Sequence, residues 1–137
     1  MDITDLPSDR ADDAIALWHD SGLTRPWNDP QADLQRAMIS PCSTVLAAFA
    51  RGVLTGTAMV GYDGHRGWVY YLAVRADRQR AGVGRDLMRA SERWLIDHDV
   101  PKINLMVRTT NVDVLAFYES LGYEDGEVVV LGKFLER

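Results

Sequence analysis

The chain has 137 residues, of which 47% are hydrophobic and 26% charged, so we expect one globular domain over residues 1–137 with its own core. A formal net charge of −5 argues against a general nucleic-acid-binding protein. Cys42 is the only cysteine, the N-terminus lacks a signal-peptide pattern and no apolar run spans a bilayer, which together favour a cytoplasmic protein without an internal disulfide or a membrane anchor.

The hydrophobic periodicity and the turn residues predict alternating strands and helices. In chain order, the expected elements are a strand at 2–6, helices at 9–21 and 30–40, strands at 44–50, 54–62 and 68–74, a helix at 84–98, a strand at 102–108, a helix at 112–121 and a strand at 128–135. Ser8, Asp29 and Asn111 are the expected helix N-caps, while Gly22 and Gly122 are the expected stops. Strands with interspersed helices predict a mixed α/β or α+β fold.

The segment 68–74 is apolar on both faces, which predicts a central strand covered on both sides. It leads into Gln79-Arg80-Ala81-Gly82-Val83-Gly84, where two closely spaced glycines precede a helix. A strand, a glycine turn and a helix N-terminus favour a phosphate site, because backbone N–H groups and the helix dipole then face the ligand. No Lys-Ser or Lys-Thr pair follows the second glycine, which argues against a nucleoside-triphosphate P-loop.

Arginine side chains are concentrated around this turn and the helix that follows it. They are Arg75, Arg78, Arg80, Arg85, Arg89 and Arg93. Two interpretations stay open. One is a solvated helix face, and the other is a patch for a ligand that carries several phosphates.

Several motifs in the second half of the chain occur in a characteristic order. They are Leu72-Ala73-Val74, Gln79-x-x-Gly82-x-Gly84, Asn111 and Ala116-Phe117-Tyr118-Glu119-Ser120-Leu121-Gly122-Tyr123. Together, over residues 44–135, they resemble the GNAT superfamily of N-acetyltransferases. More narrowly, residues 25–30 and 61–67 resemble the bacterial YpeA-type branch of that superfamily.

The resemblance implies a GNAT fold, with a mixed and mostly antiparallel sheet flanked by about four helices, and acetyl-CoA as co-substrate. It also implies that the turn holds the pyrophosphate of coenzyme A through backbone N–H groups. A bulge in the strand before the turn would free an N–H group for the thioester carbonyl, and an unbroken strand is the alternative. The implied cofactor-binding residues are Leu72, Ala73, Val74, Gln79, Arg80, Ala81, Gly82, Val83, Gly84, Arg85, Asn111 and Tyr118.

Tyr118 is the expected catalytic residue, because the resemblance assigns the matching tyrosine as the general acid that assists the departing thiolate. Asn111, Val114 and Tyr118 have helical spacing and share one face. A core or interface tyrosine is the alternative for Tyr118. Asn111 can cap the helix, touch the pantetheine arm, or do both.

The general base stays open. Many family members carry a glutamate early in the strand before the glycine turn, whereas residues 68–71 include no carboxylate. Asp63, His65, Tyr62, Tyr70 and ordered water are the options, although Asp63 and His65 belong first of all to a turn sequence. No His/Cys cluster has metal-ligand spacing, so no metal is expected.

The acceptor pocket is expected between the loop that joins the first two helices and the turn before the central strand. Acidic groups beside aromatic rings suit a cationic amine. The expected substrate-binding residues are Trp27, Asp29, Tyr62 and Asp63, with Asn28 and Trp68 as further candidates. For residues 27–30 the alternative is a capped helix start with a tryptophan packed before it.

The sequence therefore predicts an acetyl-CoA-dependent N-acetyltransferase. It would transfer an acetyl group to a primary amine of a small molecule or peptide by direct attack on the thioester. One alternative is a non-catalytic acyl-CoA-binding sensor or adaptor with the same fold, and another is an unrelated nucleotide-binding α/β domain. The oligomeric state stays open between a monomer and a homodimer.

Overall fold

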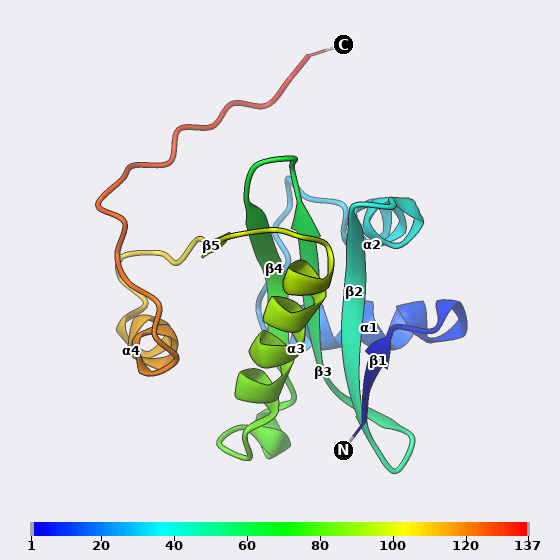
Figure 1. Cartoon of the computed structure of the whole chain (residues 1–137). Coiled ribbons are helices and arrows are strands. Elements are labelled where there is room, and N and C mark those ends of the chain that lie inside the picture. The colour runs from blue at the N-terminus through cyan, green and yellow to red at the C-terminus, as the bar shows by residue number, and fades with distance from the viewer. Residues whose placement is uncertain (1, 137) are drawn as a thin grey trace. The chain divides into compact units, whose positions relative to one another are not determined.

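The computed structural model describes residues 2–136, which form two compact units that divide between Leu105 and Met106. The first unit contains a sheet with its covering helices, and the second contains one helix and the C-terminal segment (Figure 1). The expectation of one domain over residues 1–137 therefore stays a prediction.

Strands of the first unit form one sheet in the order β1-β2-β3-β4-β5. They are β1 (Asp2–Asp5), β2 (Ser43–Ala50), β3 (Val53–Tyr62), β4 (Gly67–Val74) and β5 (Ile103–Leu105). The first three pairings are antiparallel, and the pairing of β4 with β5 is parallel. The predicted mixed and mostly antiparallel sheet is confirmed.

The β2–β3 hairpin turns at Arg51 and Gly52, as predicted. Ala50 pairs with Val53, and the two turn residues have φ angles of 51° and 77°. Two positive φ angles in a two-residue loop give a turn whose twist matches that of the flanking strands. The turn therefore sets the register of the hairpin.

The helices of the first unit are η1 (Ser8–Arg10), α1 (Ala11–Asp20), α2 (Pro30–Ile39), η2 (Ala76–Arg78) and α3 (Val83–Asp97), where η denotes a 3-10 helix. Asp29 caps α2 as predicted, because its Oδ1 accepts a hydrogen bond from the N–H of Ala32 at 3.1 Å. The prediction of Ser8 as a cap is wrong. Ser8 begins η1, so the N-cap of α1 is Arg10, and the extra turn moves the start of α1 away from Ser8.

Two adjacent residues of β3 identify the helices on each face of the sheet, because side chains alternate along a strand. Gly56 faces α3, since a Cβ atom there would lie 2.8 Å from Leu87 Cδ1 and 2.9 Å from Val83 Cγ1. Thr57 faces α1, since its Oγ1 accepts a hydrogen bond from Trp18 Nε1 at 2.9 Å. Figure 1 shows α3 on one face of the sheet and α1 with α2 on the other.

β4 is less covered than predicted. Its parallel pairing with β5 extends only from Gly67 to Val69. Tyr70 is 45% exposed, so the expectation of a strand buried on both faces is wrong at Tyr70, whereas Ala73 further along the strand is buried. An apolar run alone does not distinguish full burial from a strand that lines a cavity.

The second unit contains α4 (Val112–Ser120), which Asn111 caps by accepting a hydrogen bond from the N–H of Val114 at 3.4 Å. Gly122 follows with a φ angle of 94° and ends the helix as predicted. The predicted strand at 102–108 is shortened to β5. The predicted strand at 128–135 is wrong, because no strand pairs with this segment in residues 2–136 and strand propensity needs a neighbouring strand to act on.

Within the part of the chain that the structure describes, no helix has the length and apolar character needed to cross a membrane. Residues 2–136 also contain no cluster of three or more His, Cys, Asp or Glu side chains arranged to hold a metal ion.

Candidate active site

The glycine turn joins η2 to the N-terminus of α3 and has an unusual backbone. Arg80 and Gly82 have φ angles of 68° and 84°, both in the left-handed region. The N–H of Asp86 donates to the carbonyl of Gly82 at 3.0 Å. Helix geometry leaves the N–H groups of the first turn, before Asp86, without an intrahelical acceptor. The turn can therefore present several N–H groups to one anion.

The arginines around this turn are mostly solvent-exposed. The exposed ones are Arg78, Arg80, Arg85, Arg89 and Arg93. Arg75 pairs with Asp77 at 2.9 Å, and Arg85 lies 3.8 Å from Asp86. Both sequence interpretations of this cluster, a solvated face and a polyphosphate patch, stay open.

β4 carries a bulge just before the turn. The register on either side of it is given by the pairs Met59–Tyr70 and Thr57–Ala73. Tyr71 and Leu72 therefore stand opposite the single residue Ala58 of β3, which is the two-against-one pattern of a β-bulge. On its other edge, β4 pairs with β5 only as far as Val69 and Leu105. Leu72, Ala73 and Val74 were expected to contact the ligand. In this segment the hydrogen-bonded pairing with β3 is interrupted by the bulge, and the pairing with β5 has already ended.

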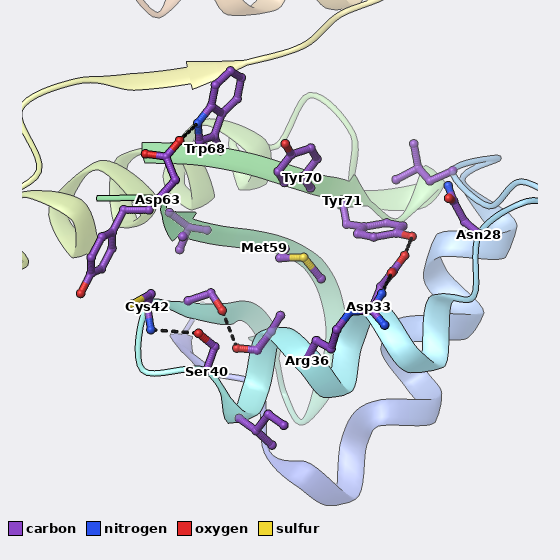
Figure 2. Close-up of a pocket in the computed structure, with 17 residues that line it drawn as sticks. Asn28, Asp33, Arg36, Ser40, Cys42, Met59, Asp63, Trp68, Tyr70 and Tyr71 are labelled. Carbon is purple, nitrogen blue, oxygen red and sulfur yellow. Dashed lines mark hydrogen bonds and ion pairs between the residues drawn. The ribbon is translucent and has the colours of Figure 1, made fainter. Parts of the chain in front are cut away.

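A cavity of about 1300 Å³ lies on the α2 side of the sheet (Figure 2). Its lining comes from the α1–α2 loop, α2, the start of β2, the end of β3 and β4. The polar and aromatic lining residues are Asn28, Asp33, Arg36, Ser40, Cys42, Ser43, Tyr62, Asp63, Trp68, Tyr70 and Tyr71. The cavity combines carboxylates with aromatic rings, which is the chemistry expected for a cationic ligand.

The structure separates the four expected substrate-binding residues into two groups. Tyr62 and Asp63 line the cavity, together with the further candidates Asn28 and Trp68. Trp27 and Asp29 are not among the lining residues: Trp27 is 59% exposed, and the Asp29 carboxylate caps α2. The alternative reading of residues 27–30 as a capped helix start is therefore supported for Asp29.

Sequence reasoning missed the lining residues on α2, of which Asp33 is the most prominent. The sequence around Asp33 gives only a weak indication of a role in the cavity. Asp33 lies one turn after the N-cap Asp29, where a carboxylate already has a structural explanation through the helix dipole. Its partner Tyr71 is far away in sequence, and only the folded sheet brings the two together.

Asp63 is held by hydrogen bonds within its own turn. Its Oδ1 accepts from the N–H groups of His65 and Arg66 at 2.9 and 2.8 Å, and its Oδ2 accepts from Trp68 Nε1 at 3.2 Å. The backbone bonds from Arg66 and then His65 hold the pKa of this carboxyl below its ordinary value. Asp63 therefore stays anionic, which suits a partner for a cation and makes it a weak base.

The cavity tyrosines have pKa values above their ordinary value. Hydrogen bonding with Cys42 is the main cause for the pKa of Tyr62, and burial is the main cause for the pKa values of Tyr70 and Tyr71. Their hydroxyls stay protonated at neutral pH and act as hydrogen-bond donors or acceptors. Of the candidate bases, Asp63, Tyr62 and Tyr70 are thus poorly tuned to remove a proton near pH 7.

Tyr118 and Asn111 belong to the second unit. Tyr118 is 8% exposed, and its ring makes edge contacts with Phe117 and Tyr123 at centroid distances of 5.0 and 5.6 Å. Burial raises the pKa of Tyr118 to about 12, so its hydroxyl is neutral over the physiological range. Asn111 serves as the helix cap. The roles of these residues toward a ligand stay predictions.

Comparison with known proteins identifies the family. The profile of the Acetyltransferase (GNAT) family matches residues 12–123. An acetyltransferase of Yersinia pestis (strain Pestoides F) and one of Yersinia pseudotuberculosis serotype I (strain IP32953) are each 40% identical over 135 residues, covering 98% of this chain and 96% of theirs.

Solved structures show the same fold. Aminoglycoside N-acetyltransferase AAC(6')-Iy in complex with a CoA-containing bisubstrate analogue aligns with a TM-score of 0.84 and 18% identity, covering 98% of this chain and 97% of its own. The metagenomic aminoglycoside acetyltransferase meta-AAC0020 in complex with sisomicin aligns with a TM-score of 0.79 and 18% identity, covering 99% of this chain and 96% of its own. The chain belongs to the acetyltransferase (GNAT) family and is an acetyltransferase.

Proposed function

We propose that the protein transfers the acetyl group of acetyl-CoA to a cationic primary amine. The observation that carries the proposal is that β4 connects three features, namely a β-bulge, the cavity and the glycine turn. Its bulge at Tyr71 and Leu72 adjoins the acidic and aromatic cavity through the Tyr71 side chain. The same strand then leads through η2 into the glycine turn.

In this proposal the turn from Gln79 to Arg85 binds the diphosphate of coenzyme A. The left-handed conformations at Arg80 and Gly82 and the N-terminus of α3 support it, because such backbone conformations and helix N-termini are able to present N–H groups to an anion. A structural relative that is 18% identical is described in complex with a CoA-containing analogue, which agrees with this assignment.

The thioester carbonyl is proposed to accept a hydrogen bond from the backbone at the bulge. An N–H group there would stabilise the oxyanion of the tetrahedral intermediate, an interaction worth about 3 kcal/mol in other enzymes. The interrupted pairing of Tyr71 and Leu72 with β3 supports this role. Most of the remaining rate acceleration would come from holding the two reactants together.

The acceptor amine is proposed to bind in the cavity with its positive charge near Asp63. Trp68 donates a hydrogen bond to this carboxylate, and Tyr62 and Tyr70 line the same cavity. An anionic carboxylate beside aromatic rings favours an ammonium group over a neutral or acidic ligand. A small-molecule amine and the amine of a peptide both satisfy this chemistry.

Tyr118 is proposed as the general acid and ordered water as the route by which the ammonium proton leaves. The raised pKa of Tyr118 keeps a proton on its hydroxyl, which can then donate a hydrogen bond to the sulfur as negative charge develops there. The low pKa of Asp63 and the raised pKa values of Tyr62 and Tyr70 support water over these side chains.

The poor tuning of Asp63, Tyr62 and Tyr70 as bases also supports a second candidate, an acyl-CoA sensor without turnover. The two candidates are separated by measuring thiol release from acetyl-CoA with a panel of amines, alongside calorimetric titration with acetyl-CoA, ATP and NAD. Amine-dependent thiol release that falls in Tyr118→Phe supports the transferase. Micromolar binding of acetyl-CoA without turnover on any amine supports the sensor, and preferential binding of ATP or NAD contradicts both.

A further inference from the structure

Tyr71 has a strained backbone at the centre of the bulge. Its φ angle is 51°, a left-handed conformation that bulky residues rarely adopt. Such conformations persist where the surroundings fix the residue from several sides. Tyr71 is fixed in this way by contacts from three different elements.

The side chain of Tyr71 is held by both helices on its face of the sheet. Its ring stacks on Trp18 of α1, with a centroid distance of 3.9 Å and an interplanar angle of 14°. Its hydroxyl donates to Asp33 Oδ2 of α2 at 2.7 Å, as Figure 2 shows. Trp18 is fully buried, so the stack has little freedom to rearrange.

The main chain of Tyr71 is held by β3. Thr57 Oγ1 donates to the carbonyl oxygen of Tyr71 at 3.0 Å and accepts from Trp18 Nε1 at 2.9 Å. The single hydroxyl hydrogen of Thr57 is therefore committed to the bulge, while Trp18 supplies its other hydrogen bond. Trp18 contacts the ring of Tyr71 directly and reaches its carbonyl through Thr57, which closes the network.

We propose that Tyr71 is a positioning residue that links the acceptor cavity to the N–H groups of the bulge. Its side chain lines the cavity beside α2, and its own backbone is the bulge. The inference rests on the proposed function, because the bulge matters for catalysis only where it holds a thioester. It also assigns Asp33 to the network, since one carboxylate oxygen accepts from Tyr71 and the other pairs with Arg36.

The consequence is a specific kinetic signature. Without the Tyr71–Asp33 contact, the strained backbone has less support and can relax toward ordinary strand geometry, which moves the N–H group of Leu72. A misplacement of about 1 Å at a reacting centre can lower the rate about 100-fold. Binding of the coenzyme A diphosphate at the glycine turn does not involve this contact. The variant should therefore lose kcat while its KM for acetyl-CoA stays unchanged.

The test compares Tyr71→Phe, which keeps the stacked ring, with Asp33→Ala and Asp33→Asn. Asp33→Asn retains an oxygen that can accept from the tyrosine hydroxyl. The matched control is Thr44→Val, because Thr44 Oγ1 donates to Asp5 Oδ1 at 2.8 Å in a similar long-range hydroxyl–carboxylate contact on β1 and β2. Steady-state kinetics are measured for each, and the three-bond amide-to-α-proton coupling of residue 71 reports its φ angle by NMR.

We expect kcat to fall at least tenfold in Tyr71→Phe and Asp33→Ala, with KM for acetyl-CoA within twofold of wild type. Asp33→Asn should recover part of the loss, and Thr44→Val should retain wild-type kcat. The coupling of residue 71 should change in Tyr71→Phe and Asp33→Ala only. Wild-type kcat in Tyr71→Phe, or an equal loss in Thr44→Val, overturns the proposal.

A different result contradicts the proposed function itself, namely that the wild-type protein turns over no amine. In that case the NMR arm still decides whether the network holds the bulge. An unchanged coupling at residue 71 in both network variants overturns the structural part of the inference, whatever the activity.

Discussion

Gly82→Ala tests whether the glycine turn binds coenzyme A. The structure offers a control variant that has similar backbone strain, so the effect of the substitution on stability can be separated from its effect on binding. Gly82 has a φ angle of 84°, and a Cβ atom there would lie 2.8 Å from Arg85 Nη2. An L-residue in this conformation costs about 1–2 kcal/mol of folding free energy. For a chain of this length we expect Tm to fall by about 3–8 °C.

Gly22→Ala is the matched control. Gly22 follows α1 with a φ angle of 70°, and a Cβ atom there would meet nothing within 4 Å. It should therefore lose a similar folding free energy through backbone strain alone. Only Gly82→Ala should weaken acetyl-CoA binding, because its methyl group enters the space next to the N–H groups. Loss of one charge-assisted hydrogen bond predicts an affinity about 10- to 100-fold lower.

Thermal unfolding and isothermal titration calorimetry with acetyl-CoA measure the two quantities in each variant. The reasoning is refuted if Gly82→Ala loses stability like Gly22→Ala but binds acetyl-CoA with wild-type affinity. It is equally refuted if both variants lose the same affinity, because the effect would then follow from strain alone.

Other consequences can be checked with single variants. Gly56→Ala should lower the free energy of unfolding in urea by about 1–3 kcal/mol, because the new Cβ atom would lie 2.9 Å from the carbonyl oxygen of Ala73, while Gly132→Ala should change little. Asp63→Asn should raise KM for cationic amines several-fold, with a difference that shrinks at high salt, and a wild-type KM would contradict its role. Tyr118→Phe should lower kcat about 100-fold. The pKa of Tyr118 is raised from 10.0 to about 12, so its contribution to stability is present below about pH 10 and is lost as the pH rises toward 12. The free energies of unfolding in urea of wild type and Tyr118→Phe should therefore change relative to each other only between about pH 10 and 12.

Several local features were predicted correctly from the sequence, although the cap expected at Ser8 was not. Asp29 and Asn111 are caps that accept hydrogen bonds from residues three positions later, so the pattern that predicts each cap lies within a few neighbouring residues. The glycine turn is equally local. The sequence predicted a turn with two closely spaced glycines before a helix, and in the structure this turn contains Gly82 in a left-handed conformation, which glycine adopts without strain.

Features that depend on distant contacts were missed or wrong. The bulge at Tyr71 depends on Trp18, Asp33 and Thr57, and none of them is close to it in sequence. The C-terminal segment 128–135 has the composition of a strand, but composition cannot supply the neighbouring strand that it needs.

The cavity shows the same division within one site. Asp63 was found because it lies in a recognisable turn beside aromatic residues. Asp33 was not found, because its position in the first turn of a helix already has a sufficient local explanation. Its place in the site comes from the tertiary contact with Tyr71.

The most direct test of acetyl transfer follows an isotope label from the acetyl group of acetyl-CoA in the presence of a cationic primary amine. The account predicts a labelled amide in an amount equal to the thiol released, and no label on the protein or on Cys42 when the amine is left out. Stable acetyl-CoA binding without any labelled amide would contradict it.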